Sequence, residues 1–172
     1  VQTTEEAIDS IPNYSSNRTM FKTRIDLFRE IARFEISTSR LLEEHGVRMS
    51  ILSGADVSRR VLMRPAPFAQ VLHALLWNSL YWVEGTAKKM IRIKVDGKDQ
   101  DTSRIIFQDN GSGISDNISN DIFEAGFTTK DGNRGMGLTV ARNLLRREGG
   151  DIKLLRDKRR AGWTSFEITL RN

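Results

Sequence analysis

Apolar residues in this sequence switch between the spacing of an α-helix and the alternation of a β-strand. Helical spacing predicts helices at residues 23–45, 65–82 and 138–147. Strand signals cover residues 47–52, 60–63, 90–95, 105–108, 152–155 and 164–170. Because strands and helices alternate irregularly, we expect an α+β fold. It would be a two-layer sandwich of one mixed sheet of about five strands, with about three helices packed on one face.

Two local connections are also predicted. The strands at 47–52 and 60–63 flank a turn at residues 53–56, and those at 90–95 and 105–108 form a long antiparallel hairpin. Residues 110–137 read as a loop-rich region that ends where the third helix begins.

The chain has room for one domain. With 172 residues, of which 38% are hydrophobic, it can bury one sizeable core. Residues 1–22 are polar and read as a linker or arm, and residues 23–172 as the domain. No apolar run approaches the roughly 20 residues that span a bilayer, so we expect no direct membrane contact and a cytoplasmic location. A membrane anchor elsewhere in a longer protein is compatible with this.

Few metal ligands of the soft type are present. The absence of cysteine excludes disulfides and thiolate metal sites, and His45 and His73 are the two histidines of the chain. A structural zinc site is therefore not expected.

The net charge of +5 comes largely from basic residues late in the chain. They are Arg142, Arg146, Arg147, Lys153, Arg156, Lys158, Arg159 and Arg160. One interpretation is a nucleic-acid surface, and the other is a solvated helix face followed by a charged hairpin. The run lacks the interleaved aromatic residues of a single-strand platform, so we favour the second interpretation and expect no nucleic-acid partner.

An acidic residue followed by two glycines ends the strand at 105–108. Asp109, with Gly111 and Gly113 after it, offers a hydrogen-bond acceptor beside a backbone that a flat ligand can approach closely. The alternative is a plain turn, because Asp-Asn-Gly sequences are common between strands.

A second glycine cluster, residues 132–138, opens the third helix. Free backbone N–H groups and the positive end of the helix dipole can bind phosphate there. The cluster lacks the Gly-Lys-Ser/Thr ending of a phosphate loop and does not directly follow a strand, so by itself it is weak evidence.

Asn78 lies mid-helix among large apolar residues, at the margin of the apolar face and on the same flank as Ala74 and Tyr81. It could be a solvent-facing polar residue. Its amide oxygen could instead bind Mg²⁺, a cation that prefers oxygen ligands and keeps water and phosphate as the rest of its shell.

Taken in order, these features and one further segment closely resemble the four boxes of the ATP-binding domain of sensor histidine kinases. The four are Asn78, the Asp109-x-Gly111-x-Gly113 segment, residues 123–130, and Gly135-x-Gly137-Leu138. That superfamily also includes DNA gyrase B, the ninety-kilodalton heat-shock chaperone and MutL. The resemblance covers residues 23–170 and implies the Bergerat-type ATP-binding fold.

The resemblance implies a role for each matching residue, with ATP and Mg²⁺ as ligands. Asp109 would accept the adenine amino group, with Thr164 holding a bridging water. Gly111, Gly113 and Ile114 would shape the base pocket.

On the phosphate side, Asn78 would bind the Mg²⁺ that bridges the phosphates. A mobile lid would include Phe123, Thr128, Thr129 and Lys130. Backbone N–H groups of Gly135, Met136, Gly137 and Leu138 would hold the phosphates. Arg134 would contact the γ-phosphate, because a guanidinium suits bidentate phosphate binding.

The sequence departs from the family pattern at several positions. Ala74 stands where kinases usually carry Asn and the ATPases a general-base Glu. Tyr81 stands where kinases often place a basic residue that touches phosphate, and Trp82 where Tyr is common. Asn133 and Arg134 stand where a further glycine is frequent.

These departures leave three functions open: the kinase domain, an ATP-driven conformational switch of the chaperone or mismatch-repair type, and a nucleotide sensor without turnover. Ala74 argues against the switch, since general-base catalysis needs a titratable group near the attacking water.

A histidine kinase needs a phosphoacceptor histidine, and neither His45 nor His73 has the flanking residues of the acceptor motif. Both are interpreted as structural. The acceptor would lie on a dimerisation hairpin upstream of Val1 or on another protein, and a response regulator would be an indirect partner. We expect the isolated domain to be monomeric.

Overall fold

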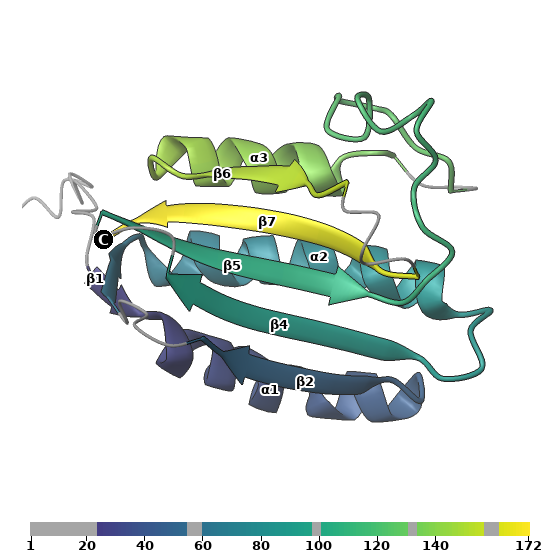
Figure 1. Ribbon diagram of the computed structural model, residues 1–172, viewed down its shortest axis with the longest axis horizontal. Coiled ribbons are helices and arrows are strands. Elements are labelled where there is room, and N and C mark those ends of the chain that lie inside the picture. Colours follow the sequence, from purple (N-terminus) through teal and green to yellow (C-terminus); the bar gives the residue numbers. More distant parts are fainter. Residues whose placement is uncertain (1–23, 55–59, 98–100, 131–133, 157–161) are drawn as a thin grey trace, which may run out of the picture.

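The computed structural model describes residues 24–54, 60–97, 101–130, 134–156 and 162–172. It has one mixed five-stranded sheet with three helices stacked against one face (Figure 1). The sheet order is β2 (Arg48–Ser53), β4 (Met90–Gly97), β5 (Thr102–Asp109), β7 (Thr164–Arg171) and β6 (Asp151–Leu154). The helices are α1 (Leu27–Glu44), α2 (Pro65–Val83) and α3 (Gly137–Arg147). The predicted α+β two-layer sandwich is confirmed.

The first helix begins later than predicted. Asp26 caps α1, because its Oδ1 accepts hydrogen bonds from the backbone N–H groups of Phe28 at 3.0 Å and Arg29 at 3.2 Å. The residues before it form strand β1 (Arg24–Asp26), which pairs antiparallel with β3 (Arg60–Leu62) in a separate two-stranded sheet. Three residues are too few to show the period of a strand, so the prediction joined them to the helix.

The strands on either side of the predicted turn at 53–56 belong to different sheets. β2 pairs in parallel with β4, whereas β3 pairs with β1. The short spacing between β2 and β3 suggested that they are neighbours, but their pairing partners lie elsewhere in the chain. Residues 55 and 56 of that predicted turn lie outside the described residues, as does the predicted arm at 1–22.

The predicted hairpin is present and longer than expected. β4 and β5 pair antiparallel from Ile91 opposite Asp109 to Gly97 opposite Ser103. β7 pairs along the other edge of β5, which places Thr164 opposite Asp109. The middle strand of the sheet therefore ends at Asp109, with α2 lying across it (Figure 1).

The core lies between the inner face of the sheet and the helices. α2 supplies its centre with Phe68, Val71, Leu72, Leu75 and Leu76, all at most 1% exposed. Burying a side chain of this size contributes roughly 1.5–3 kcal/mol, so α2 is held firmly against the sheet. The residues at its C-terminal end are thereby fixed beside the end of β5.

The region between β5 and α3 is rich in loops, as predicted; the described part of it has neither helix nor strand. Ile122 and Phe123 anchor this loop in the core. Arg156 donates hydrogen bonds to Ser119 and to the Asn120 side chain. The loop is thus attached to the end of β6 as well as to the core.

Candidate functional site

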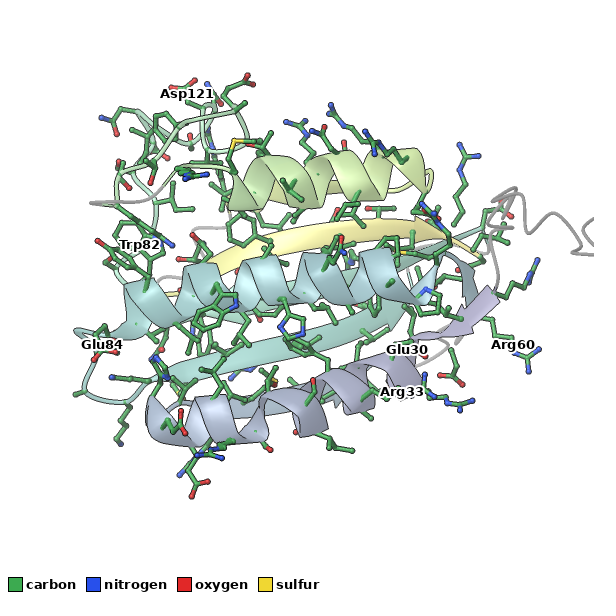
Figure 2. All side chains as sticks on the ribbon, turned by 180° about the vertical axis from the view of Figure 1, so that it is seen from behind. Glu30, Arg33, Arg60, Trp82, Glu84 and Asp121 are labelled. Carbon is green, nitrogen blue, oxygen red and sulfur yellow. The ribbon has the colours of Figure 1, made fainter. Side chains whose placement is uncertain are left out.

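A cavity of about 1510 Å³ lies between the C-terminal half of α2 and the loop that precedes α3. Figure 2 shows Trp82, near the end of α2, below the loop that carries Asp121. Twelve of the predicted site residues line this cavity: Asn78, Tyr81, Gly113, Ile114, Thr128, Thr129, Lys130, Arg134, Gly135, Met136, Gly137 and Leu138. Gly132 and Asn133 lie outside the described residues.

Asp109 is buried, at 1% exposure, beside the part of α2 that lines the cavity. Its Oδ2 accepts a 2.7 Å hydrogen bond from the Ser79 hydroxyl, and its Oδ1 accepts one of 3.0 Å from the Gly111 N–H. Burial raises the pKa of this carboxyl, and the hydrogen bonds from Ser79, Gly111 and Thr164 act in the opposite direction. A carboxylate held in one orientation beside a cavity is suited to accept a hydrogen bond from a ligand's N–H group.

The glycine at 111 is required by close packing. A Cβ there would lie 2.7 Å from the Trp82 carbonyl oxygen and 2.9 Å from Oδ1 of Asp109. Asn110 fixes the same loop, because its side chain accepts a 2.8 Å hydrogen bond from the Met90 N–H and donates one of 2.6 Å to the Lys88 carbonyl. The alternative of a plain turn does not explain this packing against α2.

Ser79 was not among the predicted site residues. It faces the core with Leu75 and Leu76 and is fully buried. A buried hydroxyl needs a hydrogen-bond partner, so its place on the apolar face was the signal that could have identified it.

Asn78 and Lys130, which both line the cavity, meet there. Lys130 Nζ donates a 2.9 Å hydrogen bond to Asn78 Oδ1 and lies 3.4 Å from the Asn78 carbonyl oxygen. It also lies 4.7 Å from the centre of the Tyr81 ring and 5.6 Å from that of Trp82. Burial lowers the pKa of Lys130 to about 8, and the charge of Asp109 opposes that shift. Two predicted site residues from distant segments are therefore in direct contact.

The donor set fits a hard divalent cation that brings its other ligands with it. The Asn78 amide oxygen faces the cavity and already holds a positive group. Among the described residues no cluster of three or more His, Cys, Asp or Glu could form an all-protein metal site. One amide oxygen, completed by phosphate and water, is the kind of coordination that Mg²⁺ accepts.

The second glycine cluster packs tightly against the loop. Gly135 has φ +62°, and a Cβ there would collide with the backbone of Gly126 and Phe127. α3 begins at Gly137, and among the described residues no side chain caps its N-terminus with a hydrogen bond. Its first N–H groups are thus available at the cavity wall, where they suit an anion.

Four predicted site residues, Asp109, Gly111, Phe123 and Thr164, do not line the cavity. Gly111 and Thr164 are instead bonded to Asp109 at the end of β5. Phe123 belongs to the core, edge-to-face with Phe166 at 6.3 Å and with the Arg142 guanidinium 4.9 Å from its ring centre. Phe123 therefore anchors the loop in the core, whereas the prediction placed it in a mobile lid.

The two histidines have structural contacts. The His45 ring Nδ1 lies 2.9 Å from the Leu41 carbonyl oxygen, and His73 packs edge-to-face on Phe34 at 5.1 Å. His45 also lines the outer part of the cavity, with Trp77.

Several of the late basic residues are paired within the chain. Arg142 and Arg146 contact Asp151, and Lys153 contacts Glu167. Residues 158–160 lie outside the described residues. The described part of this run resembles a solvated, paired face more than a nucleic-acid surface.

Relatives of known sequence share most of this region. The sensor protein FixL of Bradyrhizobium diazoefficiens is 28% identical over 147 residues, which cover 78% of this chain and 28% of the relative. The sensor histidine kinase ZraS of Salmonella typhimurium is 34% identical over 103 residues, or 58% of this chain and 21% of the relative. The chain spans less than a third of the length of either protein.

Solved structures share the fold. The mycobacterial sensor histidine kinase MprB superposes with a TM-score of 0.74 at 16% identity, covering 87% of this chain and 97% of the other. The nucleotide-free catalytic domain of histidine kinase ThkA gives 0.74 at 21% identity, covering 87% and 96%.

Within the described residues, no helix is both long and apolar enough to cross a membrane. A family model described as histidine kinase-, DNA gyrase B- and HSP90-like ATPase matches residues 63–172. This match runs from the start of α2 through both glycine loops to β7, more than half of the chain. The chain therefore belongs to the histidine kinase-, DNA gyrase B- and HSP90-like ATPase family.

Proposed function

We propose that this chain binds Mg²⁺-ATP in the cavity between α2 and α3 and is the catalytic domain of a sensor histidine kinase. It would transfer the γ-phosphoryl group to a histidine on a dimerisation hairpin, upstream or on another protein. The observation that carries the proposal is a cavity lined both by a helix N-terminus and by Asn78, an amide that already holds a cation. The buried carboxylate of Asp109 lies beside it, bonded to Ser79, the residue after Asn78.

Asp109 suits the adenine base, and the groups near Asn78 and α3 suit the phosphates. Asp109 would accept the adenine amino group, with its carboxylate held by Ser79 and Gly111. The first turn of α3 would donate N–H groups to the phosphates, and Arg134 would add a guanidinium. When bound, Mg²⁺ would neutralise phosphate charge beside Asn78.

The chain's own contribution to transfer would be positioning and charge stabilisation, because phosphoryl transfer needs little covalent chemistry from the protein. The cavity wall offers no general base at position 74, where the side chain is Ala. Glu84, the one carboxylate among the described lining residues, pairs with Lys89 at 2.8 Å. This supports transfer to a supplied acceptor over activation of water.

The relatives point the same way. ZraS is a sensor histidine kinase, and matching structures include ShkA in complex with AMPPNP and ThkA in complex with the response regulator protein TrrA. We extend nucleotide binding and a response-regulator partner to this chain as a proposal. The domain boundary at residue 23, the monomeric state and the cytoplasmic location stay predictions.

The binding claim is tested by calorimetry with a non-hydrolysable ATP analogue and Mg²⁺. Asp109→Asn should weaken binding about tenfold or more, because it replaces a hydrogen bond to a charged group by a mismatched amide. Asp121→Asn, at an exposed position of the loop, should bind like the parent. Equal affinity of Asp109→Asn and the parent chain would refute the adenine assignment.

The transfer claim needs a second experiment with labelled ATP and a supplied histidine-bearing hairpin. We expect label on the hairpin and its loss with Asn78→Ala. Steady ATP hydrolysis without the hairpin, abolished by Asn78→Ala, would indicate a conformational switch. Tight binding with neither reaction would indicate a nucleotide sensor.

A further inference from the structure

We propose that the Lys130 ammonium holds the cation position beside Asn78 while no nucleotide is bound. Mg²⁺-nucleotide must then displace it, and metal-free nucleotide can use it in place of the metal. This inference rests on the proposed function and adds to it a residue that sets how strongly binding depends on metal.

The surroundings of Nζ are those of a bound cation. The Asn78 side-chain oxygen lies at 2.9 Å and its main-chain oxygen at 3.4 Å. The rings of Tyr81 and Trp82 lie within 6 Å, the range in which an aromatic face attracts a cation. Among the described residues no carboxylate lies within salt-bridge distance of Lys130, so α2 supplies its contacts.

Lys130 reaches this position from the opposite side of the cavity. It belongs to the loop segment that lines the cavity across from α2, and its backbone N–H donates a 3.1 Å hydrogen bond to the Thr128 hydroxyl. The long side chain therefore joins the loop to α2. Its ammonium can turn toward a phosphate group in the cavity while the loop keeps its attachment.

The two cations exclude each other. Mg²⁺ bound to the Asn78 oxygen would lie within a few ångströms of an ammonium at the same oxygen, and like charges at that separation repel strongly. Arrival of the metal thus moves Lys130, and removal of the metal lets it return. Phosphate oxygens, with their negative charge, can coordinate Mg²⁺ or accept hydrogen bonds from the ammonium.

The consequence is a specific dependence on metal. The parent chain should keep measurable affinity for the ATP analogue when Mg²⁺ is removed, because Lys130 remains to neutralise the phosphates. Lys130→Met keeps the length of the side chain but removes its charge. It should therefore weaken metal-free binding much more than Mg²⁺-dependent binding.

The experiment measures analogue affinity by calorimetry, in excess Mg²⁺ and in EDTA, for the parent chain, Lys130→Met and Lys88→Met. Lys88 is exposed, and the described hydrogen bond at this residue is accepted by its main-chain oxygen. Lys88→Met is therefore a matched control for the loss of one positive charge. The ratio of Kd in EDTA to Kd in Mg²⁺ should rise about tenfold or more in Lys130→Met and stay at the parent value in Lys88→Met.

A second readout needs no nucleotide. The side-chain amide resonances of Asn78 in nitrogen-15 NMR spectra should shift in Lys130→Met and not in Lys88→Met, and addition of the Mg²⁺-analogue complex should move them in the parent.

An unchanged Kd ratio in a folded Lys130→Met that still binds Mg²⁺-analogue would overturn this inference and leave the proposed function standing. Failure of the parent chain to bind the analogue at all would instead overturn the proposed function, and this inference with it.

Discussion

The Ser79 hydroxyl on α2 donates a 2.7 Å hydrogen bond to Oδ2 of Asp109 at the end of β5. Both side chains are at most 1% exposed. The bond therefore connects the central helix to the central strand inside the core. Asn78 and Leu80, on either side of Ser79, line the cavity. It fixes one carboxylate oxygen, and the Gly111 N–H fixes the other. The orientation of Asp109 is thus set by the fold before any ligand binds.

Ser79→Ala should destabilise the domain by about 1–3 kcal/mol, because it removes one hydrogen-bond donor from a buried carboxylate. Urea unfolding monitored by circular dichroism measures this. Ser39→Ala is the matched control, since that hydroxyl is exposed and bonds a carbonyl of its own helix, Ile36. Equal changes in the two variants would show that the Ser79 bond contributes no special stability.

Gly111→Ala should destabilise the chain by about 1–3 kcal/mol and weaken binding of the ATP analogue. The added methyl would meet the Trp82 backbone and Oδ1 of Asp109, so either the loop or the carboxylate must shift. Gly85→Ala introduces the same group where no atom lies within 4 Å and should be close to neutral. The prediction is wrong if Gly111→Ala unfolds at the same urea concentration as Gly85→Ala.

The sequence was informative where a residue's environment follows from its neighbours along the chain. Asp109 could be placed because it ends an apolar strand and precedes two glycines. The pairing of β2 with β4, and of β1 with β3, could not be placed, because partners in a sheet are chosen by the packing of the whole chain. The contact between Asn78 and Lys130 is of the same kind, since it joins a helix and a loop far apart in sequence. The prediction placed Phe123 in a lid because the sequence identified the loop but did not show that this side chain is buried.

Removing the partner of a buried charge gives a third prediction. Arg64, at the start of α2, donates a 2.7 Å hydrogen bond from Nε to Oε1 of Glu148, at the end of α3. A terminal guanidinium nitrogen forms an ion pair with the same oxygen at 2.6 Å. The Glu148 side chain is 1% exposed, so Arg64→Met leaves a buried carboxylate and should cost about 3–5 kcal/mol.

Arg33→Met is the control for this pair, because Arg33 bonds Glu30 on the exposed face of α1 and should cost at most about 1 kcal/mol. Chemical denaturation compares the two variants. A loss in Arg64→Met no greater than in Arg33→Met would show that the link between α2 and α3 is dispensable.

The last prediction concerns acid stability. Hydrogen bonds from Arg104 at 2.8 Å and Lys94 at 3.0 Å hold the pKa of Asp96 below its usual value. A carboxyl whose pKa is lower in the folded than in the unfolded chain stabilises the fold at every pH above the unfolded value. That contribution is lost as the pH falls through the folded value.

Asp96→Asn should therefore lower the free energy of unfolding by about 1 kcal/mol at pH 7, the scale of a partly exposed ion pair. As the pH falls below about 4, near the unfolded pKa of Asp, the parent and the variant should converge. Urea unfolding across this pH range measures the difference, with Asp121→Asn as an exposed control. A gap between parent and Asp96→Asn that stays constant down to the lowest pH would show that the loss at pH 7 comes from packing, because only a charge-dependent contribution disappears on protonation.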